Sequence, residues 1–247
     1  MNELVLSLFP GIGLLDMAFE EQEFCVVRGP DKLWGGNIKN FHPPVAKFDG
    51  IIGGPPCQCF SQLRYVNLAA GVELAENLIP EFERVVLEAF PKWFLMENVA
   101  NAPEPGLEPY YHVRSILLNA RWFGAEQERK RRFSFGTQVA FHSAIDLSRY
   151  LDVNVFEDMN WSPAVCASGG IKPGVTGDRK TRLKYMGWKT ATALKESIRL
   201  QGLPEDFLRD APFTLEGKHK VVGNGVPLPL GRAIAQAVAK VVRLEAL

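Results

Sequence analysis

The amino-acid sequence predicts an α/β protein built around a parallel sheet. Short apolar runs bounded by Gly, Pro or Asn recur in its first half, as is typical of buried strands. Amphipathic segments with helical spacing lie between these runs, and strands that alternate with helices form a parallel sheet with helices on its faces. The 247 residues, 47% of them hydrophobic, suffice for one large domain or for one domain with a small appended lobe.

Local periodicity predicts each element in turn. Residues 4–9 form the first strand, residues 10–13 a Pro-Gly turn and residues 14–19 a helix. A second helix is expected at residues 79–89, where apolar side chains recur every three or four positions. The other predicted strands cover residues 24–27, 48–52, 93–96 and 132–137. The other predicted helices cover residues 111–120, 190–200 and 230–247.

The pattern loosens between residues 143 and 180, where Gly, Pro, Ser, Asp and Asn are mixed with little periodicity. We expect an irregular lobe there. The predicted organisation is therefore a main domain formed by residues 1–140 and 185–247, with a small lobe formed by residues 141–184.

Composition limits the classes of partner and compartment. The net charge is zero, so a polyanionic partner would need a local basic patch. Residues 129–132 and 177–184 are candidates, and the alternative is that they are simply charged residues on a solvated face. Four cysteines in a chain of this length do not make a disulfide scaffold. With no basic leader before an apolar run and no uncharged stretch of membrane-spanning length, we expect a cytoplasmic protein.

The turn FPGIG follows the first predicted strand. In an open parallel sheet, ligands bind beyond the carboxyl ends of the strands, and a glycine turn lets a cofactor approach the backbone. However, Leu14 stands where the three-glycine dinucleotide fingerprint would continue. A cofactor site and a purely structural turn therefore remain equally open from this stretch.

The stretch DGIIGGPPCQCFSQL places a cysteine on a stiff loop. Two glycines allow close backbone approach, and Pro55 and Pro56 restrict φ, so Cys57 is held in a defined place at a strand end, which suits a nucleophile. The alternatives are a buried thiol, a tight turn and a metal pair with Cys59. The four histidines show no matching ligand spacing, so we expect no metal site.

Charged residues downstream are placed for catalysis. Glu97 in FLMENV ends a predicted strand, where a carboxylate has little packing purpose. Arg129 and Arg131 in EQERKRRFSFG alternate just before another strand, which puts both guanidinium groups on one face. A nucleophilic cysteine needs such help, because its ordinary pKa of about 8.5 leaves little thiolate at neutral pH.

These segments together resemble the DNA cytosine-C5 methyltransferase family, in the family's order and along nearly the whole chain. FPGIG resembles its S-adenosylmethionine loop, GGPPCQCFS its cysteine loop, MENV its acid strand and QERKRRF its Gln-x-Arg-x-Arg motif. RLQGLPEDF and VVGNGVPLPLGRAIAQAV are similar to its last two motifs. The resemblance implies a Rossmann-like methyltransferase fold: a mixed, mostly parallel sheet with helices on both faces and a small irregular target-recognition lobe.

The resemblance also implies a DNA (cytosine-5)-methyltransferase reaction. A thiolate adds to C6 of a cytosine flipped out of double-stranded DNA, a protonated carboxyl group assists at N3 and a guanidinium group faces O2. The methyl donor is S-adenosylmethionine. The implied catalytic residues are Cys57, Glu97, Arg129 and Arg131.

The cofactor and substrate residues follow from the same resemblance. Asp31 is the candidate acid for the ribose, Trp34 could stack on adenine, and Asn37 stands where an aspartate is expected, so its oxygen accepts without carrying charge. The implied cofactor residues are Phe9, Gly11, Ile12, Gly13, Leu14, Asp31, Trp34, Asn37, Pro55, Asn224 and Val226. The implied substrate residues are Pro56, Gln58, Ser61, Gln62, Arg64 and Gln127, with residues 60–75 as the loop that closes over the base.

The small lobe, residues 141–184, is shorter than family members usually carry, so we expect a short or relaxed target sequence read by a monomer. A minimal bacterial or phage enzyme, acting in a restriction-modification setting, fits this economy. Two alternatives stay open. One is a DNA-binding homologue without turnover, suggested by Asn37, and the other is an RNA cytosine-C5 methyltransferase.

Overall fold

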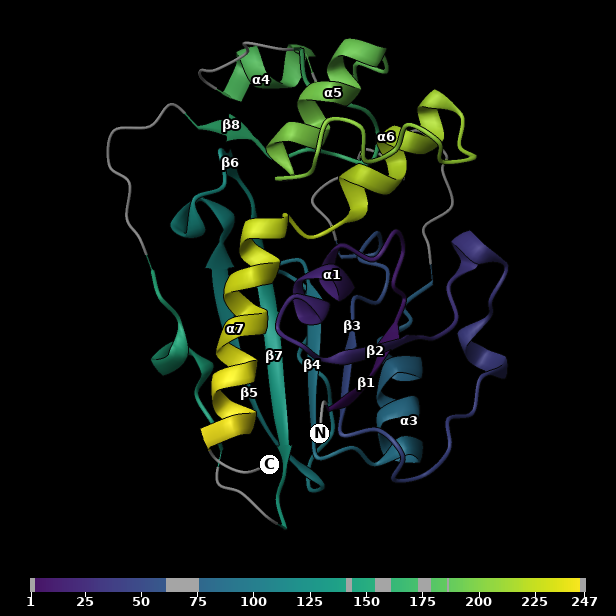
Figure 1. Cartoon of the computed structure of the whole chain (residues 1–247), viewed down its shortest axis with the longest axis vertical. Helices are drawn as coiled ribbons and strands as arrows, with labels where there is room; N and C mark the ends of the chain where they lie inside the picture. The colour runs from purple at the N-terminus through teal and green to yellow at the C-terminus, as the bar shows by residue number, and fades with distance from the viewer. Residues whose placement is uncertain are drawn as a thin grey trace.

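The computed structural model describes residues 3–60, 76–140, 144–153, 161–172, 179–185 and 187–244. A six-stranded sheet with the order β2-β1-β3-β4-β7-β5 forms its centre (Figure 1). Its strands are β1 Leu4–Leu8, β2 Cys25–Arg28, β3 Gly50–Gly53, β4 Trp93–Asn98, β5 Tyr111–Asn119 and β7 Lys130–Gln138. The first four in sheet order are parallel, whereas β7 is antiparallel to both β4 and β5. The predicted mixed, mostly parallel sheet is therefore confirmed.

Helices cover both faces of this sheet. On one face, α1 (Leu14–Glu20) and α7 (Leu228–Leu244) pack together over buried strand residues such as Val5, Trp93 and Phe135. On the other face, α3 (Ile79–Ala89) packs over a separate set of strand residues that includes Leu6, Ile51 and Phe94. Alternate residues of β1, β3 and β4 thus face opposite layers, as buried central strands require.

Two short strands and three helices gather beyond the carboxyl ends of the parallel strands, at the upper end of Figure 1. They include the short parallel pair β6 (Gln127–Glu128) and β8 (Ser162–Pro163). The helices there are α4 Arg179–Tyr185, α5 Ala191–Leu200 and α6 Leu215–Asn224. Elsewhere in the described residues are the 3₁₀ helices η1 Lys32–Trp34, η2 Ile38–Asn40, η3 Ala120–Phe123 and η4 Leu147–Tyr150. The division at residues 140 and 184 stays a prediction.

The helix predicted at residues 111–120 is wrong, because this segment is strand β5. Val113, Ile116 and Leu117 have helical spacing, which produced the prediction. In the structure, the segment pairs with β7 along its whole length, from Tyr111 opposite Gln138 to Asn119 opposite Lys130. Pairing with a strand that follows later in the chain outweighs the local pattern.

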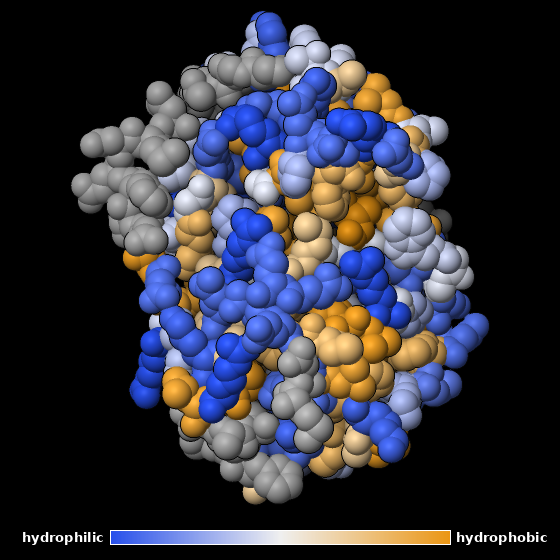
Figure 2. Space-filling view, in the orientation of Figure 1, coloured by the Kyte–Doolittle hydropathy of each residue, from blue (hydrophilic) through white to orange (hydrophobic). Residues whose placement is uncertain are grey.

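Hydrophilic side chains cover most of the face shown in Figure 2, interrupted by smaller hydrophobic areas. This agrees with the burial of most large apolar side chains in the two layers described above. Within the described ranges, no helix is long and apolar enough to cross a membrane.

Candidate active site

The glycine turn joins β1 to α1 and has an unusual backbone. Phe9, Gly11 and Gly13 all take positive φ, and the Gly13 amide donates to the Pro10 carbonyl over 2.8 Å. Glycine suits position 13 because its φ of 79° would strain a larger residue, whereas the close atom, Nη2 of Arg28 at 2.7 Å from an added Cβ, lies at the end of a flexible side chain. Ile12 is half-buried beside these residues. The sequence thus produces a tight turn at the carboxyl edge of the sheet.

Two predicted cofactor residues meet this turn from a distant segment. The Gly11 amide donates to Oδ2 of Asp31 over 2.9 Å, and Nε1 of Trp34 donates to the Gly11 carbonyl over 2.8 Å. The other Asp31 oxygen accepts from the Leu33 amide and caps η1. The structure therefore brings Gly11, Asp31 and Trp34 together, as the resemblance implied.

Trp34 is exposed but has one aromatic neighbour that the sequence did not indicate. Its side chain is 58% exposed, and its ring centroid lies 5.7 Å from that of Phe213. Phe213 precedes α6 in an aperiodic stretch, so no local signal marked it.

A buried carboxylate supports the turn from behind. Asp16 on α1 accepts from Oγ of Ser7 over 2.6 Å and from Nε of Arg28 over 3.0 Å. Burial raises the pKa of Asp16 above its ordinary value despite these donors. Asp16 was not among the residues predicted from the sequence, although a charged side chain on an otherwise buried helix face was a usable signal.

The C-terminal predicted cofactor residues adjoin the start of α1. Helix α6 ends at Asn224, which is exposed, and Val226 is buried just beyond it. Between them, Gly225 lies so close to α1 that an added Cβ would be 2.4 Å from Cδ1 of Leu14. Leu14 and the GNGV segment are therefore neighbours in space although more than half of the sequence separates them.

Asn37 lies in the neighbouring segment, at the start of η2. Its side-chain oxygen accepts from the Lys39 amide over 3.1 Å and so caps this short helix. The residue is exposed. Its oxygen is thus already engaged once, with one acceptor site left for a ligand.

The cysteine loop leaves the end of β3 and is tied to β4. Nδ2 of Asn98 donates to the Pro55 carbonyl over 3.1 Å, and Gly54 lies where a Cβ would be 3.0 Å from Oε2 of Glu97. Cys57 follows on this loop, half-buried, and its carbonyl accepts from the Phe60 amide. Asn98, which no sequence pattern singled out, therefore helps to hold the loop that carries Cys57 against the strand of Glu97.

Glu97 and Arg131 form an ion pair beside this loop. Nε of Arg131 lies 2.8 Å from Oε1 of Glu97, and the two side chains are only 15% and 12% exposed. The pairing of β4 with β7 sets this contact, since Glu97 is opposite Phe133 and Arg131 is two residues away on the same face.

Burial controls the ionisation of the acid and the thiol. It raises the pKa of Glu97 above its ordinary value, against the opposing charges of Arg131 and Arg129. It also raises the pKa of Cys57, and the Glu97 charge adds to this effect while the same two arginines oppose it. All four predicted catalytic residues therefore influence one another electrostatically.

Arg129 and Arg131 have different hydrogen-bond partners. Whereas Arg131 pairs with Glu97, Arg129 is buried, with Nη1 donating to the Val165 carbonyl and Nη2 donating to the Gly223 carbonyl over 2.8 Å. Burial and the neighbouring Arg131 lower the pKa of Arg129 below its ordinary value. The Arg129 side chain thus connects the segment that carries Val165 to the end of α6.

Gln127 does not reach a surface that a base could contact. It is fully buried, its Nε2 donates to the Leu200 carbonyl and to Oε1 of Gln201, and its Oε1 accepts from the Val165 amide. The substrate contact expected of Gln127 needs correction, because these bonds occupy its amide and tie β6 to α5.

Other predicted residues are placed less fully. Pro55 is buried, Pro56 is half-buried and Gln58 is exposed on the cysteine loop. Ser61, Gln62 and Arg64 lie outside the described residues, as does most of the predicted closing loop. The four cysteines are free thiols, and no group of three or more potential metal ligands occurs in the described part of the chain.

Comparisons with known proteins place this arrangement in a family. Residues 35–160 match the family described as C-5 cytosine-specific DNA methylase. The chain is 33% identical to the type II methyltransferase M.FnuDI of Fusobacterium nucleatum, over 95% of this chain and 93% of the relative. It is 28% identical to the type II methyltransferase M.MthTI of Methanothermobacter thermautotrophicus, over 97% and 98%.

Solved structures share the fold at low sequence identity. The Entamoeba histolytica methyltransferase EhMeth superposes with a TM-score of 0.62 at 15% identity, covering 98% of both chains. The Dnmt2 methyltransferase of S. pombe superposes with a TM-score of 0.60 at 13% identity, covering 100% of both chains. The chain therefore belongs to the C-5 cytosine-specific DNA methylase family and is a DNA (cytosine-5)-methyltransferase.

Proposed function

We propose that this enzyme methylates C5 of a cytosine flipped out of duplex DNA, with Cys57 as the covalent nucleophile. The observation that carries the proposal is the Glu97–Arg131 ion pair beside the loop that ends in Cys57. A donor to N3, a cation for O2 and a thiol for C6 are the groups that activate a cytosine ring at C5.

The covalent steps balance as follows. The Cys57 thiolate forms a bond to C6, and the electron pair of the C5–C6 double bond moves toward C5. The protonated Glu97 carboxyl group donates to N3, while Arg131 stabilises the charge that spreads to O2. C5 then takes the methyl group, and the donor's sulfonium would be left as a neutral thioether. A base takes the C5 proton, N3 returns its proton to Glu97, the C5–C6 double bond re-forms and the Cys57 thiolate leaves.

The ionisation of these groups supports their proposed roles. The raised pKa of Glu97 keeps its carboxyl group protonated to higher pH than an ordinary glutamate, and only the protonated form donates. The raised pKa of Cys57 keeps the resting thiol neutral, so its activation depends on the positive charges nearby. Arg131 and Arg129 favour that thiolate.

The family uses S-adenosylmethionine, and the turn around Gly11 fits it. An added Cβ at Gly11 would meet no atom within 4 Å, so the backbone there is open to a ligand. Asp31 keeps acceptor capacity for ribose hydroxyls beyond its two backbone contacts, and the exposed Trp34 offers a stacking face. When bound, this cofactor supplies an electrophilic methyl group; Asp31, Trp34, Leu14 and Asn224 would hold it.

Target choice is proposed to lie in the small lobe, residues 141–184. Its few positions support a short or relaxed recognition sequence, because reading base edges requires several placed side chains. The type II methyltransferases among its relatives support a role in restriction and modification. Nanopore sequencing of DNA from cells that express the enzyme would report both the modification and its sequence context.

Covalent trapping tests the nucleophile. Duplex DNA that contains 5-fluorocytosine should form a stable adduct with the wild-type enzyme and cofactor, because fluorine at C5 cannot leave as a proton. Cys57→Ser should form none, and the matched control Cys59→Ser should trap normally. An adduct that persists in Cys57→Ser, or vanishes in Cys59→Ser, would show that the nucleophile has been misassigned.

A further inference from the structure

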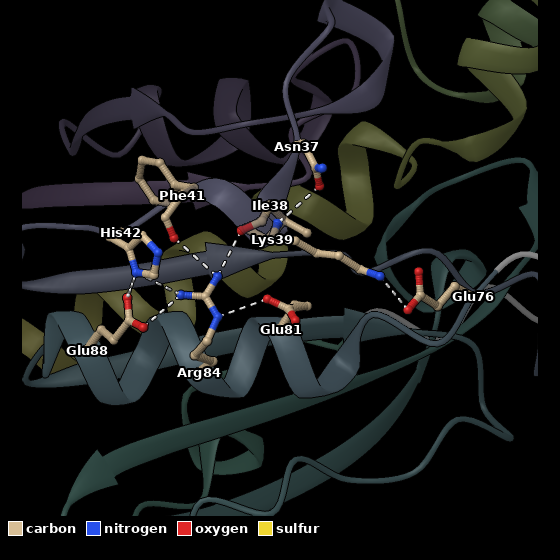
Figure 3. A network of polar contacts seen from close by, with 9 residues as sticks. All are labelled: Asn37, Ile38, Lys39, Phe41, His42, Glu76, Glu81, Arg84 and Glu88. Carbon is tan, nitrogen blue, oxygen red and sulfur yellow. Dashed lines mark hydrogen bonds and ion pairs between the residues drawn. The ribbon is translucent and has the colours of Figure 1, made fainter.

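Arg84 on α3 lies in a network that reaches the segment around Asn37 (Figure 3). Its Nη2 donates to the carbonyl of Ile38 over 2.8 Å and to that of Phe41 over 3.1 Å. The side chain is only 27% exposed. One guanidinium group therefore holds carbonyls at both ends of η2, the 3₁₀ helix that Asn37 caps.

Two carboxylates orient this guanidinium group from its own helix. Nε of Arg84 donates to Glu81 over 2.9 Å, and Nη1 donates to Glu88 over 2.8 Å. Glu88 also contacts Nδ1 of His42 over 3.0 Å, which ties the residue after Phe41 to the same helix. Figure 3 shows these side chains converging on Arg84 from α3 and from the 38–42 segment.

Such support matters because η2 has little rigidity of its own. It spans only three residues, and 3₁₀ helices have poor internal hydrogen-bond geometry. Ile38 anchors it by packing against α3 and the sheet, and Lys39 pairs with Glu76 over 2.7 Å at the exposed surface. An exposed ion pair contributes little, so the two carbonyl contacts of Arg84 are the main polar restraint on this turn.

We propose that Arg84 is a positioning residue for the adenine end of the cofactor. This inference rests on the cofactor site proposed above and on the adenine contact that the family resemblance implies for Asn37. Nη2 of the planar guanidinium group donates to both carbonyls while Nε and Nη1 donate to Glu81 and Glu88, an arrangement that a single ammonium group cannot reproduce. By fixing η2, Arg84 fixes the direction in which the Asn37 amide meets the adenine ring, although Arg84 itself touches no substrate.

The test measures cofactor affinity and turnover in Arg84→Met and Arg84→Lys. Calorimetry should show S-adenosylmethionine binding about tenfold weaker in Arg84→Met, which is the worth of one well-placed hydrogen bond. The KM for the cofactor should rise equally while kcat stays within about twofold, because the reacting groups lie elsewhere. Arg84→Lys should stay impaired, because an ammonium group cannot contact Glu81, Glu88 and both carbonyls together; full affinity in this variant would contradict the need for the guanidinium group.

An altered cofactor separates positioning from general loss of structure. In the inosine analogue of S-adenosylhomocysteine, a carbonyl oxygen replaces the adenine amino group and N1 carries a proton. Wild type should discriminate against this analogue relative to S-adenosylhomocysteine about tenfold, and Arg84→Met should lose most of that discrimination. A merely destabilised enzyme would bind both more weakly but keep their ratio.

The matched control is Arg232→Met. Arg232 forms a two-point ion pair with Glu21 over 2.6 and 2.7 Å, far from η2 along the chain. It should leave both affinity and discrimination unchanged. If Arg84→Met matches wild type in affinity and discrimination, this inference fails alone; if the wild type itself binds no S-adenosylmethionine, the proposed cofactor site fails instead.

Discussion

Replacing Arg129 by methionine should destabilise the enzyme more than it impairs the chemistry at cytosine. The substitution keeps an unbranched apolar stem but removes the guanidinium group that donates to the Val165 and Gly223 carbonyls. Next to these contacts, α6 lies so near the segment after Val165 that a Cβ on Gly223 would be 2.3 Å from the backbone of Cys166 and Ala167. Arg129 therefore holds α6 against the segment of Val165, and the two are packed too closely to rearrange.

The structure sets the size of this effect. Each hydrogen bond from a charged donor contributes about 1.5–3 kcal/mol, so two contribute roughly 3–6 kcal/mol. Part of this loss is offset, because the folded variant no longer contains a guanidinium charge that has to be desolvated. We expect a net loss of about 3 kcal/mol, which lowers the melting temperature of a protein of this size by roughly 6–12 °C.

Thermal unfolding followed by circular dichroism measures this change, and Arg131→Met is the matched comparison. Because Arg131 is paired with Glu97 beside the reacting groups, its variant should lose turnover and 5-fluorocytosine trapping with a smaller change in melting temperature. A melting temperature of Arg129→Met within about 2 °C of wild type, with kcat reduced at least as much as in Arg131→Met, would refute this reasoning. Arg129 would then act on the substrate.

Three further substitutions test two residues of the site and one buried histidine of α6. Glu97→Gln should lower kcat by about 10²–10⁴, measured by methyl incorporation, since it removes a general acid. Because burial raises the pKa of Glu97 above its ordinary value of 4.5, ionising this group lowers the free energy of unfolding as pH rises above 4.5. Denaturation midpoints of Glu97→Gln should lack that loss. Asp31→Ala should weaken S-adenosylmethionine binding at least tenfold by calorimetry, because Gly11 loses its carboxylate partner; unchanged affinity would remove Asp31 from the cofactor site. Burial lowers the pKa of His219 below its ordinary 6.5, so the free energy of unfolding should fall as pH drops below 6.5. Urea unfolding at pH 7.5 and 5.5 should show a smaller change in that free energy for His219→Gln than for wild type. An equal change in both proteins would assign the effect to another group.

The sequence by itself determined the features that depend on local chemistry. Strand, glycine turn and helix at the start of the chain follow from a short apolar run, backbone freedom at glycine and helical spacing, and all three occur as predicted. Local order along the chain also placed Cys57, Glu97 and the two arginines beside strand ends. Such features were predictable because the residues that produce them are neighbours in sequence.

Tertiary structure decided what depends on distant partners. Strand β5 exists because β7 pairs with it, against a helical pattern in its own residues. The alternation of Arg129 and Arg131 predicted a shared role, yet carbonyls from two remote segments hold the first and a carboxylate holds the second. Gln127 is occupied in the same way by α5. These outcomes depend on which groups meet after folding, because a buried donor must find an acceptor wherever the fold supplies one.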